Sequence, residues 1–315
     1  MTVLPLRAAV VGVGHLGRHH ARIMAQIPDV TLVAVVDINE PRAVEVASAL
    51  GARSYRHARD ILGAVDLVSI AAPTEVHREL ATLFLGAGVP VLVEKPLARS
   101  VEGVDAILAA AEASGACLAV GHTERFNPAV TAARPLVAAP KFVEVHRLGT
   151  FPERSLDIDV VFDLMIHDLD LVLSMVGGEV DSIEAVGVPV LTPRIDIANA
   201  RLRFTSGCVA NITASRISRD RTRKIRFFQR DAYISIDCGA REAEVYRLIR
   251  REGDRPGIEG GPIPVSDGEP LRLELEDFAE AVRTGRPPRV GGWDARRAVH
   301  LAQQITARML EGPRP

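Results

Sequence analysis

The sequence is poor in cysteine, aromatic residues and net charge, and each scarcity argues against a class of protein. The three cysteines, Cys117, Cys208 and Cys238, stand far apart and form no CxxC pair, so neither a disulfide framework nor a zinc site is expected. The net charge of −2 provides no overall attraction to nucleic acid or to an anionic membrane. Aromatic residues make up only 4% of the chain without a stacking motif, which argues against RNA binding.

Long apolar segments and leader-like features are also missing. No apolar run reaches the roughly 18 residues that a membrane-spanning helix needs. The first seven residues, Met1–Arg7, are too short and too weakly apolar for a secretory signal. We therefore expect a cytoplasmic protein with no nucleic-acid or membrane partner. Because 315 residues exceed what one core usually serves, two domains are expected.

The first 122 residues alternate between short apolar runs and helical patterns. Strands are predicted at residues 8–13, 31–37, 66–73, 90–96 and 117–122, and helices at 16–27, 41–50, 75–87 and 101–113. Strands that are apolar throughout and alternate with helices indicate a parallel sheet covered on both faces. The fold class predicted for residues 1–122 is therefore an α/β Rossmann domain.

The pattern changes after residue 122. Several later runs alternate apolar and polar residues, which is typical of a mixed or antiparallel sheet with one open face. Helices are expected at residues 160–176, 273–284 and 293–310, and a long Gly/Pro-rich surface loop at 253–270. We therefore predict an α+β domain over residues 123–315, whose last helix could pack back on the first domain. An open sheet face often becomes an interface, so a homodimer or homotetramer is expected.

A glycine motif follows the first predicted strand and opens a helix. The motif GxGxxG comprises Gly12, Gly14 and Gly17, with His15 and Leu16 between the last two glycines. In a Rossmann domain such glycines allow a tight turn, the approach of a pyrophosphate and close helix packing, and the helix N-terminus attracts the phosphates. The alternative is a glycine turn without a ligand.

An acidic residue at the end of the second strand indicates which dinucleotide binds. Asp37 comes 20 residues after Gly17, where a carboxylate accepts hydrogen bonds from the adenosine ribose. The carboxylate of Asp37 would repel a 2′-phosphate, and no arginine follows immediately. NAD is therefore favoured over NADP.

Several further motifs resemble the glucose–fructose oxidoreductase / inositol dehydrogenase / rhizopine-catabolism (Gfo/Idh/MocA) family. Besides the glycine loop they are Ala72-Pro73-Thr74 with His77, Glu94-Lys95-Pro96, the Asp163–His167 segment, and the closing segments 277–290 and 294–310. The resemblance covers the whole chain. It implies a Rossmann domain, an NAD cofactor and hydride transfer at a hydroxyl of a sugar-like substrate.

The residue types in these motifs suit the oxidation of a secondary alcohol. A base of near-neutral pKa should take the hydroxyl proton, and His167 is of that type. Asp163 lies one helical turn earlier and can orient the imidazole or hold a hydroxyl. Lys95 can donate to the reacting oxygen and stabilise negative charge on it. The chain has only three lysines among its 38 basic residues, so a lysine at this position favours a chemical role over a plain positive charge.

The resemblance assigns roles to these positions. Lys95, Asp163 and His167 match the catalytic trio and would also contact the substrate. Glu94 would touch the nicotinamide ribose, and Ala72, Pro73, Thr74 and His77 would line the cofactor cleft.

Each assignment has a plainer alternative. Lys95 could be a solvated charge, His167 a core histidine, and Asp163 a first-turn acid favoured by the helix dipole. His167 with Asp168 and Asp170 could suggest a metal, but no further ligand set is evident and hydride transfer needs none. No metal is therefore expected.

Two segments resemble the nucleotide-sugar branch of the family. They are residues 157–172, which contain Asp157-Ile158-Asp159-Val160 in place of a glycine-rich lead-in, and residues 121–130. The resemblance implies oxidation of UDP-N-acetylglucosamine to its 3-keto form, for lipid A or surface glycans. A free sugar or an inositol-type polyol is the alternative substrate, and a non-catalytic NAD-binding regulator is the alternative of another class.

Two basic features could bind phosphate. Arg125 follows the fifth strand and is expected to contact substrate or cofactor phosphate, with a loop salt bridge as the alternative. The segment Arg216–Arg226 contains five arginines and Lys224. That segment suits a diphosphate or a solvated edge strand, and the sequence leaves both interpretations open.

Overall fold

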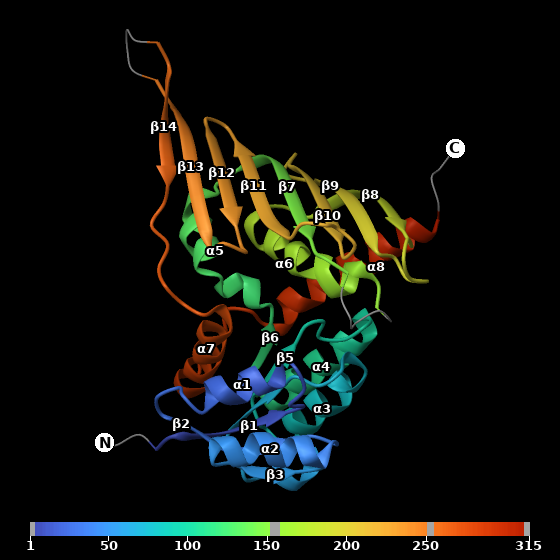
Figure 1. Cartoon of the computed structure of the whole chain (residues 1–315), viewed down its shortest axis with the longest axis vertical. Helices are drawn as coiled ribbons and strands as arrows, with labels where there is room; N and C mark the ends of the chain where they lie inside the picture. The colour runs from blue at the N-terminus through green and yellow to red at the C-terminus, as the bar shows by residue number, and fades with distance from the viewer. Residues whose placement is uncertain (1–3, 152–157, 251–254, 312–315) are drawn as a thin grey trace. The chain divides into compact units, whose positions relative to one another are not determined.

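The computed structural model describes residues 4–151, 158–250 and 255–311, and the chain forms two compact units (Figure 1). The first unit comprises Met1–Thr123 and Glu269–Val299, and the second comprises Glu124–Gly268 and His300–Pro315. Residues 1–3 of the Met1–Arg7 segment and residues 253–254 of the predicted loop lie outside the described residues, as does Asp157. Within the described ranges, no helix combines the length and apolar character needed to cross a bilayer.

The first unit is built on a parallel sheet. Its strands are β1 (Leu6–Val11), β2 (Val30–Val36), β3 (Arg53–Tyr55), β4 (Leu67–Ile70), β5 (Val91–Glu94) and β6 (Leu118–Gly121), in the order β3-β2-β1-β4-β5-β6. The helices are α1 (Gly17–Met24), α2 (Glu40–Leu50), α3 (Thr74–Gly86) and α4 (Val101–Ser114), with a 3₁₀ turn at Ala58–Ile61. This order is that of a Rossmann fold, so the predicted fold class is confirmed.

Capping residues explain where two of these helices begin and end. Asn39 precedes α2 and accepts a hydrogen bond from the backbone N–H of Arg42. Ser100 does the same for α4, accepting from the N–H of Gly103. Gly51 and Gly115 follow the two helices in the left-handed conformation that ends many helices.

The helix α7 (Pro270–Thr284) and the first turns of α8 (Gly292–Leu310) belong to the first unit. Leu275, Phe278 and Ala279 of α7 are buried in the same core as Val10 and Leu32. From the sequence, residues 123–315 were assigned to the second domain, with the last helix allowed to pack back on the first, so the place of α7 in the first unit was not predicted. The apolar stripe of α7 was visible in the sequence, but its packing partner was not.

The second unit contains a mixed sheet, as predicted, and the described residues form eight strands of it. The strands are β7 (Pro140–Leu148), β8 (Val180–Val188), β9 (Ile197–Phe204), β10 (Val209–Ser215), β11 (Thr222–Gln229), β12 (Ala232–Asp237), β13 (Glu242–Ile249) and β14 (Gly257–Pro262). Their order is β14-β13-β12-β11-β7-β10-β9-β8, with β7 and β10 parallel and the other pairs antiparallel.

The loop predicted at residues 253–270 is wrong for Gly257–Pro262, which forms the edge strand β14. A Cβ atom at Gly260 would lie 2.0 Å from the carbonyl oxygen of Val245. The glycines that suggested a loop therefore permit a close strand pairing.

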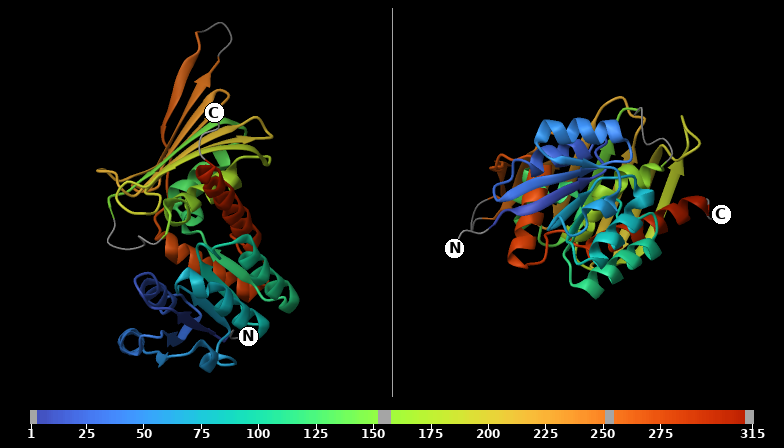
Figure 2. Two further views of the ribbon diagram at one scale, coloured as in Figure 1. Left: turned by 90° about the vertical axis from the view of Figure 1, so that its right-hand side faces the viewer. Right: turned by 90° about the horizontal axis from the view of Figure 1, so that it is seen from below.

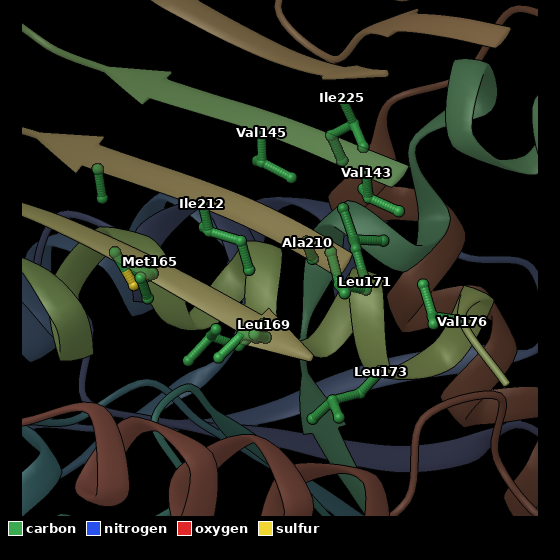
Figure 3. Packing of buried hydrophobic residues seen from close by; sticks show 14 of the residues in the cluster. Val143, Val145, Met165, Leu169, Leu171, Leu173, Val176, Ala210, Ile212 and Ile225 are labelled. Atoms are coloured by element: carbon green, nitrogen blue, oxygen red, sulfur yellow. The ribbon is translucent and has the colours of Figure 1, made fainter. Parts of the chain in front are cut away.

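One face of this sheet carries the core of the second unit. Helices α5 (Pro128–Ala133) and α6 (Ile166–Met175) and the part of α8 from His300 pack on it (Figures 1 and 2). Short turns occupy Thr123–Phe126, Arg134–Leu136 and Val161–Met165. Figure 3 shows Leu169 and Leu171 of α6 beside Val143 and Ile212 of the sheet. The core thereby fixes the helix on which the candidate acid–base residues lie.

Candidate functional site

The glycine loop of the first unit is shaped by two tight contacts and one open position. Gly12 has a φ of +82°, and a Cβ there would lie 2.7 Å from the backbone of Ala72. A Cβ at Gly17 would lie 1.8 Å from the carbonyl oxygen of Gly12. At Gly14 an added Cβ would meet only the Nη1 of Arg42, at 3.7 Å. Packing within the protein therefore requires Gly12 and Gly17, whereas it leaves room for a side chain at Gly14.

The open position at Gly14 fits the phosphates of a dinucleotide. The helix α1 begins after Leu16 with no side-chain cap. The N–H groups of Arg18 and His19 donate to the carbonyl oxygens of Gly14 and Leu16, so the N–H groups just before them, those of Leu16 and Gly17, are the ones that can serve an anion. Leu16 is 45% exposed, and the ring of His15 lies edge-on to that of His19 at 5.8 Å. Gly14 with the uncapped turn would hold the pyrophosphate of NAD.

Asp37 is held rigidly beside this loop. Its Oδ2 accepts a hydrogen bond from the N–H of Val13 at 2.9 Å, and its Oδ1 accepts from the N–H of Asn39 at 2.8 Å. Each oxygen keeps a second lone pair for a ribose hydroxyl. Arg42 reaches the same carboxylate, with its Nη1 at 3.5 Å from Oδ2. Arg42 was not predicted as a site residue, although it lies in the first turn of the helix that follows Asp37.

The segment after β4 begins with the predicted cofactor-lining residues. Ala72 and Thr74 are half-buried and Pro73 is exposed. His77 is buried, with its Nε2 2.8 Å from the carbonyl oxygen of Ala72 and its Nδ1 3.0 Å from that of Pro96. Both ring nitrogens of His77 thus serve the protein backbone, so a cofactor contact through its nitrogens stays a prediction that this geometry does not favour.

Glu94 and Lys95 stand at the end of β5. The Oε1 of Glu94 lies 3.0 Å from the Nε2 of His20, and its Oε2 accepts from the backbone N–H of Lys95 at 3.2 Å. Burial alone would raise the pKa of the Glu94 carboxyl, but the hydrogen bond from His20 and the charges of Lys95 and His77 lower it. His20 was not predicted as a site residue. The one indication in the sequence was a polar residue on the apolar, buried face of α1.

The second unit carries Asp163 and His167. Asp163 lies in a π-helical turn, Val161–Met165, and His167 is the second residue of α6 directly after it; both are half-buried. The continuous helix predicted over residues 160–176 is thus widened at its start. Such turns are frequent at functional sites. Asp159, just before the turn, accepts the N–H of Ile195 at 3.0 Å and anchors its beginning.

Arg125 is buried and forms an ion pair. Its Nε donates to the Oδ2 of Asp170 at 2.8 Å. The salt bridge named as the alternative is therefore present in the structure, and a phosphate contact by Arg125 stays a prediction. Beside it, Arg147 bonds with two nitrogens to Asp168, at 2.7 and 2.9 Å. Asp168 and Asp170 are thus engaged in ion pairs, which accounts for the acidic cluster without a metal.

The basic segment Arg216–Arg226 divides into structural and exposed residues. Arg216 is fully buried, pairs with Asp196 at 2.9 Å and donates to the carbonyl of Ile158. Arg226 pairs with Glu144 across the sheet. The exposed members of the segment are Arg219, Arg221 and Arg223. Lys224 lies 3.3 Å from Asp237 and keeps 41% of its side chain exposed. A diphosphate contact stays open for Lys224 and these three arginines.

Comparison with known proteins places this geometry in a family. Residues 6–122 match the model of an oxidoreductase family with an NAD-binding Rossmann fold, and residues 144–235 match the GFO/IDH/MocA C-terminal domain. The chain is 39% identical to a UDP-N-acetylglucosamine 3-dehydrogenase of Acidithiobacillus ferrooxidans, across 96% of this chain and 97% of that one. The chain belongs to the Gfo/Idh/MocA family. The predicted family and NAD cofactor are confirmed, and the protein is an oxidoreductase.

A solved structure of the same enzyme and one further relative extend the comparison. A solved structure of the Acidithiobacillus ferrooxidans enzyme superimposes with a TM-score of 0.90 at 38% identity, covering 97% of this chain and 98% of that one. The NAD-linked scyllo-inositol 2-dehydrogenase of Bacillus subtilis is 28% identical over 92% of this chain and 90% of its own length. The resemblance to Gfo/Idh/MocA proteins thus extends over both units.

Proposed function

We propose that this protein oxidises the 3-hydroxyl of UDP-N-acetylglucosamine, with NAD as the oxidant. The observation that carries the proposal is the 39% identity to an enzyme of that name, over nearly the whole of both chains. The retained Lys95, Asp163 and His167 support a catalytic protein over a non-catalytic NAD-binding regulator, since a regulator has no need of all three.

Each of the three residues has a role in the proposed reaction. NAD, when bound, accepts the hydride from the carbon that is oxidised. His167 takes the proton from the hydroxyl, so the substrate loses one hydride and one proton. Asp163 orients the imidazole from the π-helical turn before it. Lys95 donates a hydrogen bond to the reacting oxygen and stabilises its negative charge.

The cofactor would be held by residues of the first unit. Gly14 and the first turn of α1 would bind the pyrophosphate, and Asp37 the adenosine ribose. Leu16, Ala72 and Thr74 would contact the remaining cofactor surface. The proposal of NAD over NADP rests on the Asp37 carboxylate, because a 2′-phosphate there would meet a negative charge.

A second candidate function is oxidation of a free sugar or inositol, favoured by the similarity to the scyllo-inositol enzyme. Purified protein should be incubated with NAD and UDP-N-acetylglucosamine, UDP-glucose, N-acetylglucosamine, myo-inositol or glucose. The absorbance of NADH is followed in the presence of a carbonyl trap, because a keto product is disfavoured at equilibrium. Turnover of UDP-N-acetylglucosamine alone supports the proposal, whereas turnover of only free sugars or inositol rejects it.

We also propose a homo-oligomer formed through the open face of the large sheet. Four aromatic rings cross this face from β7 to β13, with centroids 5.6, 5.2 and 6.3 Å apart: Phe142, Phe228, Tyr233 and Tyr246. Phe228 is 37% exposed and Tyr246 is 38% exposed in the single chain. A partner subunit would bury them. We propose further that the enzyme acts in the cytoplasm and that its keto-sugar product is used to build lipid A or surface glycans.

A further inference from the structure

A buried histidine links three elements of the first unit behind Lys95. His20 on α1 is fully buried, and so is Ser69 on β4. The Nδ1 of His20 lies 2.8 Å from the Oγ of Ser69, and its Nε2 lies 3.0 Å from Oε1 of Glu94. The helix that opens at the glycine loop is therefore tied through one side chain to the turn that carries Lys95.

The hydrogen-bond partners define the direction of the contact between His20 and Glu94. A carboxylate only accepts hydrogen bonds, so the Nε2 of His20 donates to Glu94. The hydroxyl of Ser69, which can donate or accept, holds the other ring nitrogen, Nδ1. The second oxygen of Glu94 binds the backbone N–H of Lys95. The ring of His20 thus orients the Glu94 carboxylate.

A second buried histidine contacts the turn that carries Lys95. The two ring nitrogens of His77 on α3 lie 2.8 and 3.0 Å from the carbonyl oxygens of Ala72 and Pro96, so the backbone fixes the orientation of this ring. Burial raises the pKa of the Glu94 carboxyl, but the hydrogen bond from His20 on α1, together with Lys95 on its own segment and His77 on α3, lowers it below its usual value.

We propose that His20 is a positioning residue that acts through Glu94: it keeps the carboxylate ionised and oriented, and thereby fixes the Lys95 turn relative to the cofactor-binding helix. This inference rests on the proposed dehydrogenase function, and it assigns a role to a residue that touches neither substrate nor cofactor. Two variants separate the size of the His20 side chain from its hydrogen bond. His20→Leu keeps a side chain of similar volume and removes the donor to Glu94, whereas His20→Gln can still donate.

The coupling is measured first without turnover, by calorimetric titration of NAD. His20→Leu and Glu94→Gln should each weaken NAD binding, and the double variant should bind about as weakly as Glu94→Gln alone. Losses in affinity that simply multiply would overturn the proposal. His57→Leu, an exposed histidine of the same unit, is the matched control and should bind NAD as the wild type does.

The pH dependence of turnover is measured next. His20→Leu should lose about 10- to 100-fold in kcat at neutral pH. Its acid limb should shift to higher pH, because the Glu94 carboxylate has lost its donor and takes up a proton more readily. His20→Gln should keep the wild-type pH profile. An unshifted acid limb in His20→Leu, or the same shift in both variants, would contradict the role assigned to His20.

The two proposals fail in distinguishable ways. If the wild type oxidises none of the sugars, the proposed function fails, while the NAD-binding cycle still tests the link between His20 and Glu94. If His20→Leu does not fold, the cycle is run with His20→Gln, whose NAD affinity should stay within about threefold of the wild type because the donor remains. A larger loss in His20→Gln would overturn the proposal.

Discussion

The glycine loop allows the effects of a substitution on folding and on NAD binding to be separated. An alanine at Gly14 places its Cβ in open space, with the nearest atom, the Nη1 of Arg42, at ordinary van der Waals distance. The backbone at Gly14 is not in the left-handed region. Gly14→Ala should therefore leave the apo protein unchanged or stabilise it by about 0.5 kcal/mol, since it restricts the unfolded chain.

The same methyl group should impair binding. It would hold the pyrophosphate away from the first turn of α1, weakening charge-assisted hydrogen bonds worth about 1.5–3 kcal/mol each. Loss of one such bond corresponds to a roughly 10- to 100-fold weaker affinity for NAD. Gly17→Ala is the matched control, because its Cβ would lie 1.8 Å from the carbonyl oxygen of Gly12. That overlap should cost about 1–3 kcal/mol of stability.

Thermal unfolding of the apo proteins and calorimetric titration with NAD check both effects. We expect Gly14→Ala to unfold at the wild-type temperature and bind NAD weakly, and Gly17→Ala to unfold at a lower temperature. Wild-type NAD affinity in Gly14→Ala would refute the placement of the pyrophosphate. An apo Gly14→Ala protein as unstable as Gly17→Ala would refute the interpretation of the open position.

Three further predictions follow from the charged groups. Asp37→Ser should lower the preference for NAD over NADP by about tenfold or more, measured as the ratio of the two dissociation constants, because the repelling carboxylate is gone. Arg147→Met should cost about 3–5 kcal/mol in denaturant unfolding, since it leaves the buried Asp168 without its partner, and adding Asp168→Leu should recover part of the loss. Burial alone would raise the pKa of the Asp196 carboxyl, but backbone N–H groups from Thr192, Val190 and Leu191 lower it. The ionised Asp196 carboxylate therefore stabilises the fold fully at neutral pH, and this contribution disappears as the pH falls from about 4 towards the lowered pKa. Asp196→Asn should reduce the free energy of unfolding at pH 7 and make that free energy depend less on pH in the acid range.

Local sequence patterns predicted the parts of the fold that depend on neighbouring residues. The glycine loop, the strand before it and the acid after the second strand follow from spacing and from the conformations that glycine allows. Asp37 was placed correctly beside the loop because the ends of parallel strands lie at one edge of the sheet. The mixed sheet was visible in alternating polarity along strands such as β9 and β10.

Features that depend on distant partners could not be predicted in this way. The sequence shows an apolar stripe on α7 but not the core that it joins. Arg125 after a strand end looks like a phosphate ligand until Asp170, 45 residues later, is found beside it. His20 is one polar residue on an apolar helix face, and only the structure brings Ser69 and Glu94 to its two nitrogens.

The most direct test of the central claim follows the hydrogen that leaves the substrate. UDP-N-acetylglucosamine carrying deuterium on carbon 3 is incubated with the enzyme, NAD and a carbonyl trap, and the reduced nicotinamide is analysed by mass spectrometry. The account predicts reduced NAD one mass unit heavier than from unlabelled substrate, and none from the His167→Ala variant. Reduced NAD without deuterium, or no reduced NAD with the wild-type enzyme, would contradict it.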